Sequence, residues 1–335
     1  MIAGWVHVAF PVDDASRIGE ARRHAAAQAR DLGWDEVDAG RLALVVTELG
    51  SNLLRHANKG RLLVAARPQS GEIEVLAIDK GPGISNVAQC LGDGFSTGST
   101  PGTGLGAVRR LADVFDIHSS VPQGTVVLAR LARQRLLPAR GRGLELGAVA
   151  VCAPGEIVCG DGWTASLDGG RAAVLLADGL GHGPEAAAAA QAAVDVFARD
   201  PHGDLRATLE EAHRELRSTR GAAVTALQAD GADGSIRSAG AGNITVRIVA
   251  GDHDRTLLSQ HGTIGVQMRR LQEVRADWPP HAAIVLYSDG VEGRWAPQLI
   301  HPLLAHDPAL IAAVLVRDHF RGRDDATVVV LRRKG

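Results

Sequence analysis

Four aspartates in the second half of the chain could together bind divalent metal ions. Each lies beside an apolar run that is typical of a buried strand, and the set comprises Asp161, Asp178, Asp289 and Asp324. Carboxylate oxygens suit hard cations such as Mn²⁺ or Mg²⁺, and the sequence places no paired His or Cys beside them that would favour zinc. Asp178 and Gly179 could also form an Asp-Gly hairpin turn. However, Pro184 follows them and is typical of a first helical turn, so we expect Asp178 to end a buried strand and bind metal.

A second set of residues, in the first half of the chain, could bind a nucleotide. Glu48 and Asn52 are four residues apart in an expected helix, so their side chains share one helix face. Asp79 follows an apolar run and begins a D-x-G-x-G motif with Gly81 and Gly83. A glycine-rich segment then opens another expected helix, where clustered backbone N–H groups favour phosphate. That segment comprises Gly102, Thr103, Gly104, Leu105 and Gly106.

Each nucleotide motif alone is typical of an ordinary turn or a solvated helix face. In their order and spacing over residues 5–131, however, they resemble the GHKL (Bergerat) ATP-binding fold of gyrase, Hsp90, histidine kinases and the MutL proteins. The resemblance implies that Asn52 coordinates the Mg²⁺ that bridges the phosphates of ATP and that Asp79 binds the adenine amino group. It also implies that Gly83 lets the base approach the backbone and that the glycine-rich segment surrounds the phosphates. Glu48 takes the position of the general base.

Within this fold, the first half looks like the serine kinases of bacterial anti-sigma pathways, especially the stress-response switch kinases. The segment before the glycine-rich motif is short, and no helix with a phosphoacceptor histidine precedes Glu48. The resemblance implies that Glu48 deprotonates a serine hydroxyl of a partner protein for attack on the γ-phosphate of ATP. The alternative is an ATP-dependent binding module or anti-sigma factor that holds a partner without phosphorylating it.

Over residues 144–332, the aspartate pattern resembles the SpoIIE-type branch of the PP2C metal-dependent serine/threonine phosphatases. The resemblance implies that Asp178 bridges two Mn²⁺ or Mg²⁺ ions and that Gly179 contributes its carbonyl, while the other three aspartates supply the remaining carboxylates. Two ions about 3.5–4 Å apart can acidify a bridging water for attack on phosphorus. Many members carry a second acid in a G-D-x-x-D arrangement, whereas residues 162–165 contain none. This departure concerns metal number and affinity rather than the fold.

The composition indicates a globular protein of two domains. The chain has 335 residues, of which 45% are hydrophobic and 22% are charged, as in ordinary soluble proteins. Its net charge of −2 argues against a nucleic-acid partner. Neither a secretion signal nor an apolar run of membrane-spanning length is evident, so we expect a cytoplasmic protein without a membrane partner. Three cysteines, without paired C-x-x-C spacing, fit a reducing compartment.

The elements that position these residues form two α+β halves joined by a linker. We expect a GHKL α/β sandwich in residues 1–131, a linker of Arg, Pro and Gly in residues 132–143, and a PP2C-like α-β-β-α sandwich in residues 144–335. The expected helices of the first half are residues 13–32, 35–57 and 105–115, and its strands are residues 5–12, 61–67 and 72–79, with two more near residue 130. In the second half, helices are expected at 184–199, 204–217 and 308–319, and strands at 145–152, 164–168, 171–178, 222–229, 234–239, 243–250, 282–288 and 326–331.

The two resemblances together imply a bifunctional bacterial partner-switching regulator. The first half would be an ATP-dependent protein serine kinase, and the second a metal-dependent phosphoserine phosphatase. The implied substrate is a STAS-type anti-sigma antagonist or a stressosome scaffold protein, and a sigma factor or a further phosphatase are other candidate partners. The alternative is a phosphatase whose GHKL half only binds ATP and a partner.

Overall fold

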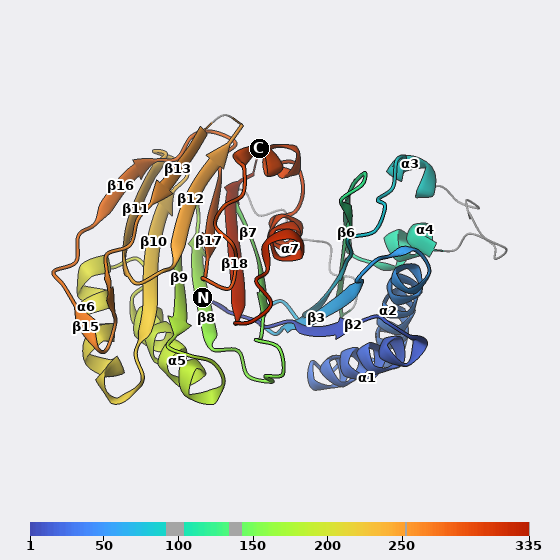
Figure 1. Ribbon diagram of the computed structural model, residues 1–335, viewed down its shortest axis with the longest axis horizontal. Helices are drawn as coiled ribbons and strands as arrows, with labels where there is room; N and C mark the ends of the chain where they lie inside the picture. The colour runs from blue at the N-terminus through green and yellow to red at the C-terminus, as the bar shows by residue number, and fades with distance from the viewer. Residues whose placement is uncertain (92–103, 134–142, 252, 335) are drawn as a thin grey trace. The chain divides into compact units, whose positions relative to one another are not determined.

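The computed structural model describes residues 1–91, 104–133, 143–251 and 253–334 (Figure 1). The chain divides into two compact units, one formed by residues 7–140 and the other by residues 1–6 together with residues 141–335. Most of the expected linker, residues 134–142, lies outside the described residues. Within the described ranges, no helix combines the length and the apolar character that a membrane span requires.

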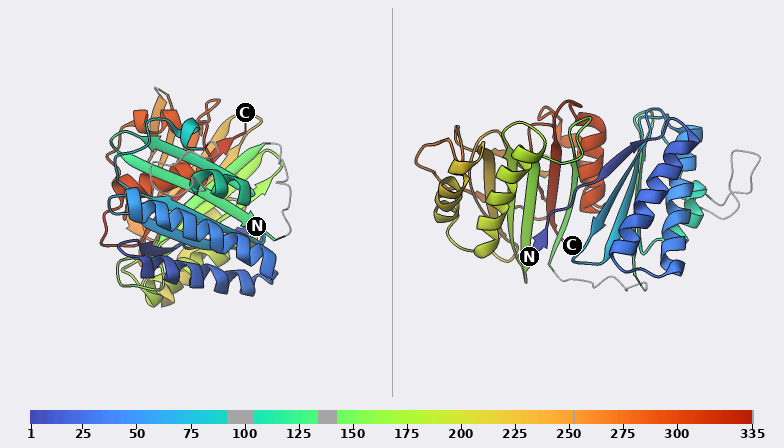
Figure 2. Two further views of the ribbon diagram at one scale, coloured as in Figure 1. Left: turned by 90° about the vertical axis from the view of Figure 1, so that its right-hand side faces the viewer. Right: turned by 90° about the horizontal axis from the view of Figure 1, so that it is seen from below.

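The unit of residues 7–140 is an antiparallel sheet covered by helices on one face (Figures 1 and 2). The strands lie in the order β2 (Val8–Pro11), β3 (Arg61–Arg67), β4 (Glu72–Ile78), β6 (Gly124–Ala132) and β5 (Val114–Ser120). The helices are α1 (Ala15–Asp31), α2 (Glu36–His56), the short α3 (Val87–Cys90) and α4 (Gly104–Leu111). This arrangement confirms the expected α/β sandwich.

Helix α2 carries Glu48 and Asn52, and its sequence is amphipathic and well capped. The Asp35 side chain accepts a hydrogen bond from the Asp38 backbone N–H at 2.8 Å and so begins the helix, a contact that stabilises a helix by about 1 kcal/mol. Leu42, Val46 and Leu49 recur at helical spacing and are buried in the core of the unit. This anchored stripe fixes the rotation of α2 and therefore the directions of its other side chains.

Helix α4 is shorter than the sequence indicated. It ends at Leu111 rather than continuing to Phe115, because Val114 and Phe115 pair with Arg130 and Ala129 as the start of β5. Strand pairing in the sheet overrides the helical periodicity of these two residues.

The second unit is two sheets stacked face to face with helices outside (Figures 1 and 2). One sheet has the order β1-β8-β9-β10-β11-β16 and packs against α5 (Pro184–Arg199) and α6 (Leu205–Glu215). The other has the order β13-β12-β17-β18-β7 and packs against α7 (Pro308–His319). The expected α-β-β-α sandwich is confirmed. The strands of this unit are β1 (Ile2–Ala3), β7 (Leu144–Val151), β8 (Asp161–Asp168), β9 (Arg171–Gly179), β10 (Ala222–Asp230), β11 (Ser235–Ala241), β12 (Thr245–Ala250), β13 (His253–Leu257), β14 (Gly262–Thr263), β15 (Gln267–Met268), β16 (Val274–Asp277), β17 (Ala283–Tyr287) and β18 (Ala326–Arg333).

The first six residues belong to this second unit, not to the ATP-site unit as the expected domain of residues 1–131 would have it. Ile2 and Ala3 pair with β8 as an edge strand. The rings of Trp5 and Trp163 pack edge to face with their centroids 4.6 Å apart, and the Trp163 indole N–H donates a hydrogen bond to the Trp5 carbonyl at 3.2 Å. The boundary of the first unit therefore lies at His7, because this pairing and the burial of Trp5 bind the preceding residues to β8.

We expect Trp5→Ala to destabilise the unit of residues 1–6 and 141–335 by about 3 kcal/mol, because it removes a 5% exposed indole from the face of Trp163. Thermal unfolding monitored by Trp fluorescence and by phosphatase activity would show the loss, whereas the melting of the ATP-site unit, followed by nucleotide protection, should not change. Val6→Ala, at an exposed neighbouring position, is the control. Equal destabilisation of both units by Trp5→Ala would contradict this assignment.

Candidate functional site

The four predicted aspartates come together from both sheets of the second unit. Asp161 begins β8 and lies directly opposite Asp178 of β9 in the antiparallel register. Asp289 follows β17 by two residues and Asp324 precedes β18 by two residues, in the other sheet. After Asp178 and Gly179 the chain turns into α5 at Pro184, so the hairpin alternative is wrong. The two sheets thus present four carboxylates at the ends of their central strands.

A hydrogen-bond network orients these carboxylates across the two sheets. The Ser288 hydroxyl donates to Asp161 Oδ2 at 2.7 Å and accepts from the Thr327 backbone N–H at 3.0 Å. The Asn243 amide donates to Asp289 Oδ2 at 2.7 Å. Neither Ser288 nor Asn243 was among the candidate residues expected from the sequence: Ser288 directly precedes Asp289, but nothing in the sequence places it against Asp161 of the other sheet. Asp161 is consequently held between strands of both sheets.

Burial, together with repulsion from neighbouring carboxylates, raises the pKa values of Asp161, Asp178 and Asp289. Burial, followed by repulsion from Asp161, Asp289 and Asp324, raises the pKa of Asp178 to about 9. Burial raises the pKa of Asp161 to about 7, against the opposing hydrogen bond from Ser288. Burial and repulsion from Asp324 also raise the pKa of Asp289. The cluster therefore disfavours its own ionised form unless positive charge is added.

Hard divalent cations fit this cluster. Its ligand atoms are all oxygens, and Asp161 Oδ1 is buried with no hydrogen-bond partner among the described residues. The Gly179 backbone lies so close to α5 that an added Cβ would be 2.0 Å from the Ala186 carbonyl oxygen, which explains the glycine there. Bound ions would supply the positive charge that ionises the carboxylates at neutral pH and acidifies a water molecule.

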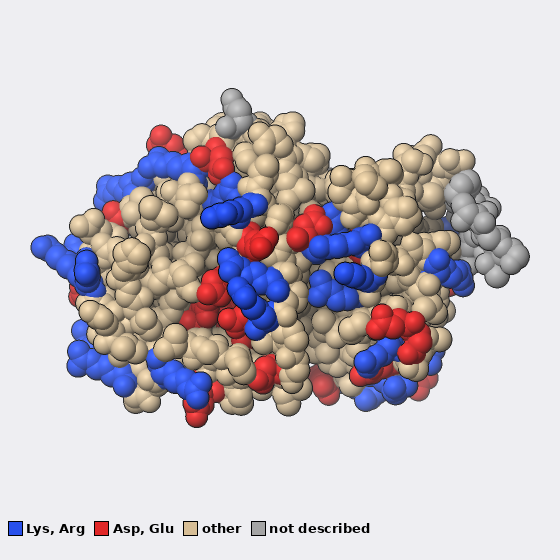
Figure 3. Space-filling model, in the orientation of Figure 1, with Lys and Arg blue, Asp and Glu red and all other residues tan. Residues whose placement is uncertain are grey.

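Basic side chains lie beside the acidic cluster. Arg321 and Arg323 are exposed on the loop before Asp324, and their positive charges lower the pKa of Asp289 against the larger effects of burial and Asp324. Figure 3 shows acidic side chains gathered over the strands of this unit with Lys and Arg side chains next to them. A dianionic phosphate group would find compensating charge on the rim formed by these arginines.

We expect the metal-free protein to lose stability as the pH rises from 5 to 9, and Mn²⁺ to reverse that loss. The pKa values of Asp161 and Asp178 in the folded state lie above their ordinary value of 3.8. The folded state therefore binds more protons than the unfolded state, and stability falls as these carboxyl groups ionise. The melting temperature measured against pH, in EDTA and then in Mn²⁺, checks this. Asp178→Asn should flatten the metal-free fall, and an unchanged profile in that variant would contradict the assignment.

The nucleotide motifs of the first unit also come together. Helix α2 presents Glu48 and Asn52 one turn apart, and α4 begins beside them: a Cβ added to Gly104 would lie 3.6 Å from Asn52 Oδ1. Asn52 Nδ2 is buried and has no hydrogen-bond partner in the described ranges. An amide oriented toward the N-terminal end of a helix in this way fits the Mg²⁺-bound phosphates of ATP. Leu105 and Gly106 lie in α4, whereas Gly102 and Thr103 lie outside the described residues.

At the expected adenine site, Asp79 and the glycines after it form a tight turn against the β5–β6 hairpin. Asp79 Oδ1 accepts a hydrogen bond from the Gly81 backbone N–H at 2.6 Å. Gly83 has a φ of +76°, and a Cβ there would lie 2.5 Å from the Ser120 carbonyl oxygen. The Thr125 carbonyl, which no motif in the sequence indicates, accepts a hydrogen bond from the Asp79 backbone N–H at 3.0 Å. The turn thus requires glycine for both conformation and space.

Each half of the chain matches a known protein family. Residues 10–131 match the histidine kinase-like ATPase domain family, and residues 168–334 match the stage II sporulation protein E (SpoIIE) family. The serine/threonine-protein kinase RsbT of Bacillus subtilis (strain 168) is 38% identical over 104 residues, which are 30% of this chain and 77% of RsbT. The chain therefore carries a histidine kinase-like ATPase domain followed by a SpoIIE domain.

Two solved structures extend the comparison. A chain from work on the bacterial stressosome, a modular system adapted to control secondary messenger signalling, is 30% identical with a TM-score of 0.54, and covers 57% of this chain and 100% of that one. RsbX in complex with magnesium is 18% identical with a TM-score of 0.52, covering 57% and 96%, and shows a shared fold. The SpoIIE half is a serine/threonine phosphatase domain of the PP2C type, and the ATPase half is homologous to a serine/threonine kinase.

Proposed function

We propose that this protein both phosphorylates and dephosphorylates one serine of a partner protein. The observation that carries the proposal is that four carboxylates at strand ends of two packed sheets occur in the same chain as a helix that presents Glu48 and Asn52 one turn apart. Opposite chemistries in one polypeptide would set the phosphorylation level of the partner by their relative rates.

In the proposed forward reaction, Glu48 accepts the proton of the serine hydroxyl as its oxygen bonds to the γ-phosphorus of ATP, and ADP leaves. Asn52 would hold Mg²⁺, which neutralises charge on the phosphates. Asp79 would hydrogen-bond the adenine amino group, and Gly104 with its neighbours would contact the phosphates through backbone N–H groups.

In the proposed dephosphorylation reaction, water attacks the phosphorus of phosphoserine, and the serine oxygen leaves and is protonated. Asp178, with the carbonyl of Gly179, would hold two Mn²⁺ or Mg²⁺ ions together with the other three aspartates. Those ions supply an acidified water and charge stabilisation. Arg321 and Arg323 would attract and orient the incoming phosphate group.

The proposed partner is a STAS-type anti-sigma antagonist or a stressosome scaffold protein. Support comes from the kinase RsbT and from the structure described in work on the bacterial stressosome, which are 38% and 30% identical to the parts of this chain that they match. A sigma factor or a further phosphatase remain other candidates for binding the ATPase half. The non-catalytic alternative, an ATP-dependent binding module, predicts binding of the partner without turnover.

A steady-state ATP assay distinguishes the two functions. If both activities act on the same serine, adding a STAS-domain protein in amounts far below ATP should produce many equivalents of ADP and phosphate per STAS protein, because each cycle regenerates the serine. A variant of the STAS protein with alanine at the phosphorylated serine is the control and should give no stimulation. ATP binding without partner-dependent turnover would overturn the kinase proposal in favour of the binding module.

A further inference from the structure

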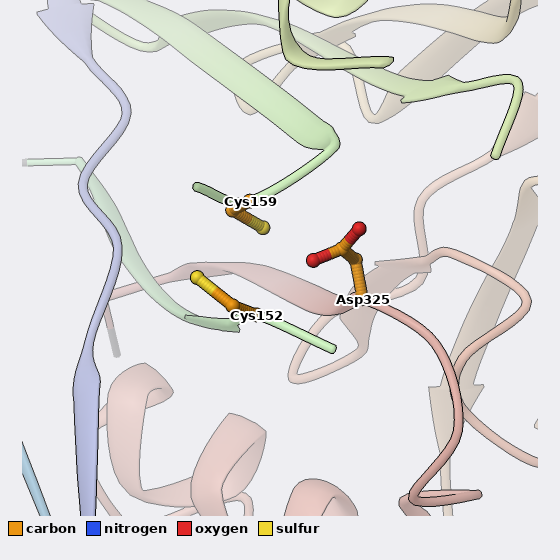
Figure 4. A group of neighbouring side chains, drawn as sticks. All are labelled: Cys152, Cys159 and Asp325. Carbon is orange, nitrogen blue, oxygen red and sulfur yellow. The ribbon is translucent and has the colours of Figure 1, made fainter. Parts of the chain in front are cut away.

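A cluster of two thiols and a carboxylate lies next to the phosphatase aspartates. The Sγ atoms of Cys152 and Cys159 and a carboxylate oxygen of Asp325 all lie within 4.8 Å of one another. Figure 4 shows the three side chains converging from separate segments. Cys152 follows β7, Asp325 precedes the neighbouring strand β18, and Cys159 precedes β8 of the opposite sheet. The cluster therefore bridges the two sheets.

Asp325 is unusual because its carboxylate is buried while only one of its two oxygens accepts a hydrogen bond from the described residues. It is 3% exposed, and its Oδ1 accepts from the Ala153 backbone N–H at 2.8 Å. Its Oδ2 is buried without a hydrogen-bond partner among the residues that the structure describes. A Cβ on Gly160 would lie 2.7 Å from that oxygen, so the glycine next to Cys159 leaves it space. A buried polar atom without a partner is costly unless a ligand satisfies it.

We propose that Cys152, Cys159 and Asp325 bind one thiophilic divalent cation of the Zn²⁺ class, at a site separate from the four-aspartate cluster. Cysteine sulfurs select soft or borderline ions, in contrast to the oxygens of the aspartate cluster. Tetrahedral Zn²⁺ with bonds of about 2.3 Å to sulfur and about 2.0 Å to oxygen places its ligand atoms about 3.5–3.8 Å apart. Side-chain rotations that close the present separations by about 1 Å would complete the site, with water as a fourth ligand on the half-exposed side of Cys152.

An ion at this site would stabilise the segments next to Asp161 and Asp324 without being bound by the four aspartates. Cys159 lies two residues before Asp161, and Asp325 directly follows Asp324. A cation shared by these neighbours would fix the loop of residues 152–160 to the start of β18. The expected consequence is added thermal stability of this unit in low concentrations of Zn²⁺ or Cd²⁺.

Cadmium titration of the full chain in a thiol-free reductant tests the proposal. We expect one Cd²⁺ per chain to produce a thiolate-to-cadmium charge-transfer absorption, which a carboxylate site cannot give, and excess Mg²⁺ to leave it in place. Cys152→Ser and Cys159→Ser should each lower the absorption at one equivalent at least twofold, and Asp325→Asn should weaken binding with both thiols kept. Cys90→Ser is the matched control, because Cys90 is the remaining cysteine and lies in α3.

Several outcomes would overturn the proposal. They are an absorption that persists in Cys152→Ser, one that disappears in Cys90→Ser, and one that Mg²⁺ displaces at equal concentration. Recovery of a Cys152–Cys159 disulfide from protein isolated without reductant, with no cadmium absorption after reduction, would identify a redox pair in its place. If Cys159→Ser, at a buried position, fails to fold, the half-exposed Cys152→Ser decides the result.

Discussion

Replacing Asp178 with alanine should lower phosphoserine hydrolysis by roughly 10³-fold or more. Asp178 faces Asp161 in the register of β8 and β9, and burial, followed by repulsion from the other acids, raises its pKa to about 9. Its removal would take away the group proposed to bridge both ions. In the presence of ATP and a STAS-domain protein, we expect phosphoserine to accumulate to one per partner, where the unaltered protein keeps it low.

The loss of activity in Asp178→Ala should not reflect unfolding. Removing Asp178 should leave the metal-free protein at least as stable as the parent at pH 8, because the raised pKa of Asp178 means that folding at this pH requires its carboxylate to take up a proton. Asp168→Ala is the matched control, since Asp168 lies at the other end of β8, is exposed and pairs with Arg171. The hydrolytic activity of both variants is measured as phosphate release from a phosphorylated STAS protein in the absence of ATP. Retained hydrolysis in Asp178→Ala would remove it from the catalytic centre.

Replacing Glu48 with alanine should lower serine phosphorylation by about 10²–10⁴-fold, the usual contribution of a general base. ATP affinity should change little, because Asn52, Asp79 and the glycine-rich segment are the groups proposed to bind the nucleotide. Hydrolysis of a phosphorylated partner should be unaffected. The measurement is phosphoserine formation in the Asp178→Ala background, so that hydrolysis by the phosphatase half does not remove the product.

Glu36→Ala provides the comparison for Glu48, because Glu36 is an exposed acid on the first turn of the same helix. It should keep normal phosphorylation. Phosphorylation at the parental rate in Glu48→Ala would assign the base to another residue. If Asp178→Ala itself forms no phosphoserine while ATP still binds, the ATPase half acts as a binding module and the kinase proposal fails.

Much of the fold could be predicted because its elements carry strong local signals. Helices α1 and α2 have Asp caps and a regular apolar stripe, and β3, β4 and β9 are apolar runs between turn residues. Strands β13 to β16 were missed, since they are two to five residues long with few buried positions. Strand β1 has only two residues, so no periodicity could reveal that it pairs with β8.

The residues of the candidate site also fall into those that the sequence could predict and those that it could not. The four aspartates could be found because each lies beside an apolar run, which fixes its position at the end of a buried strand. Ser288 and Asn243 could not be assigned, because their roles depend on which strands of the two sheets become neighbours. The proximity of Cys152, Cys159 and Asp325 had no spacing signal either: it arises only when β7 and β18 pair and the second sheet packs on them.

The position of β1 has a practical consequence for dividing the protein. Because residues 1–6 complete the phosphatase sheet and residues 7–140 form the other unit, the ATPase domain is topologically an insert between the first strand of the phosphatase and the remainder of it. A single proteolytic cut within residues 134–142 would leave two fragments still joined through β1 and the Trp5–Trp163 contact. A fragment that starts at residue 144 would instead lack its edge strand and expose Trp163. Separating the two units intact would therefore require excising residues 7–140 and rejoining the flanking ends.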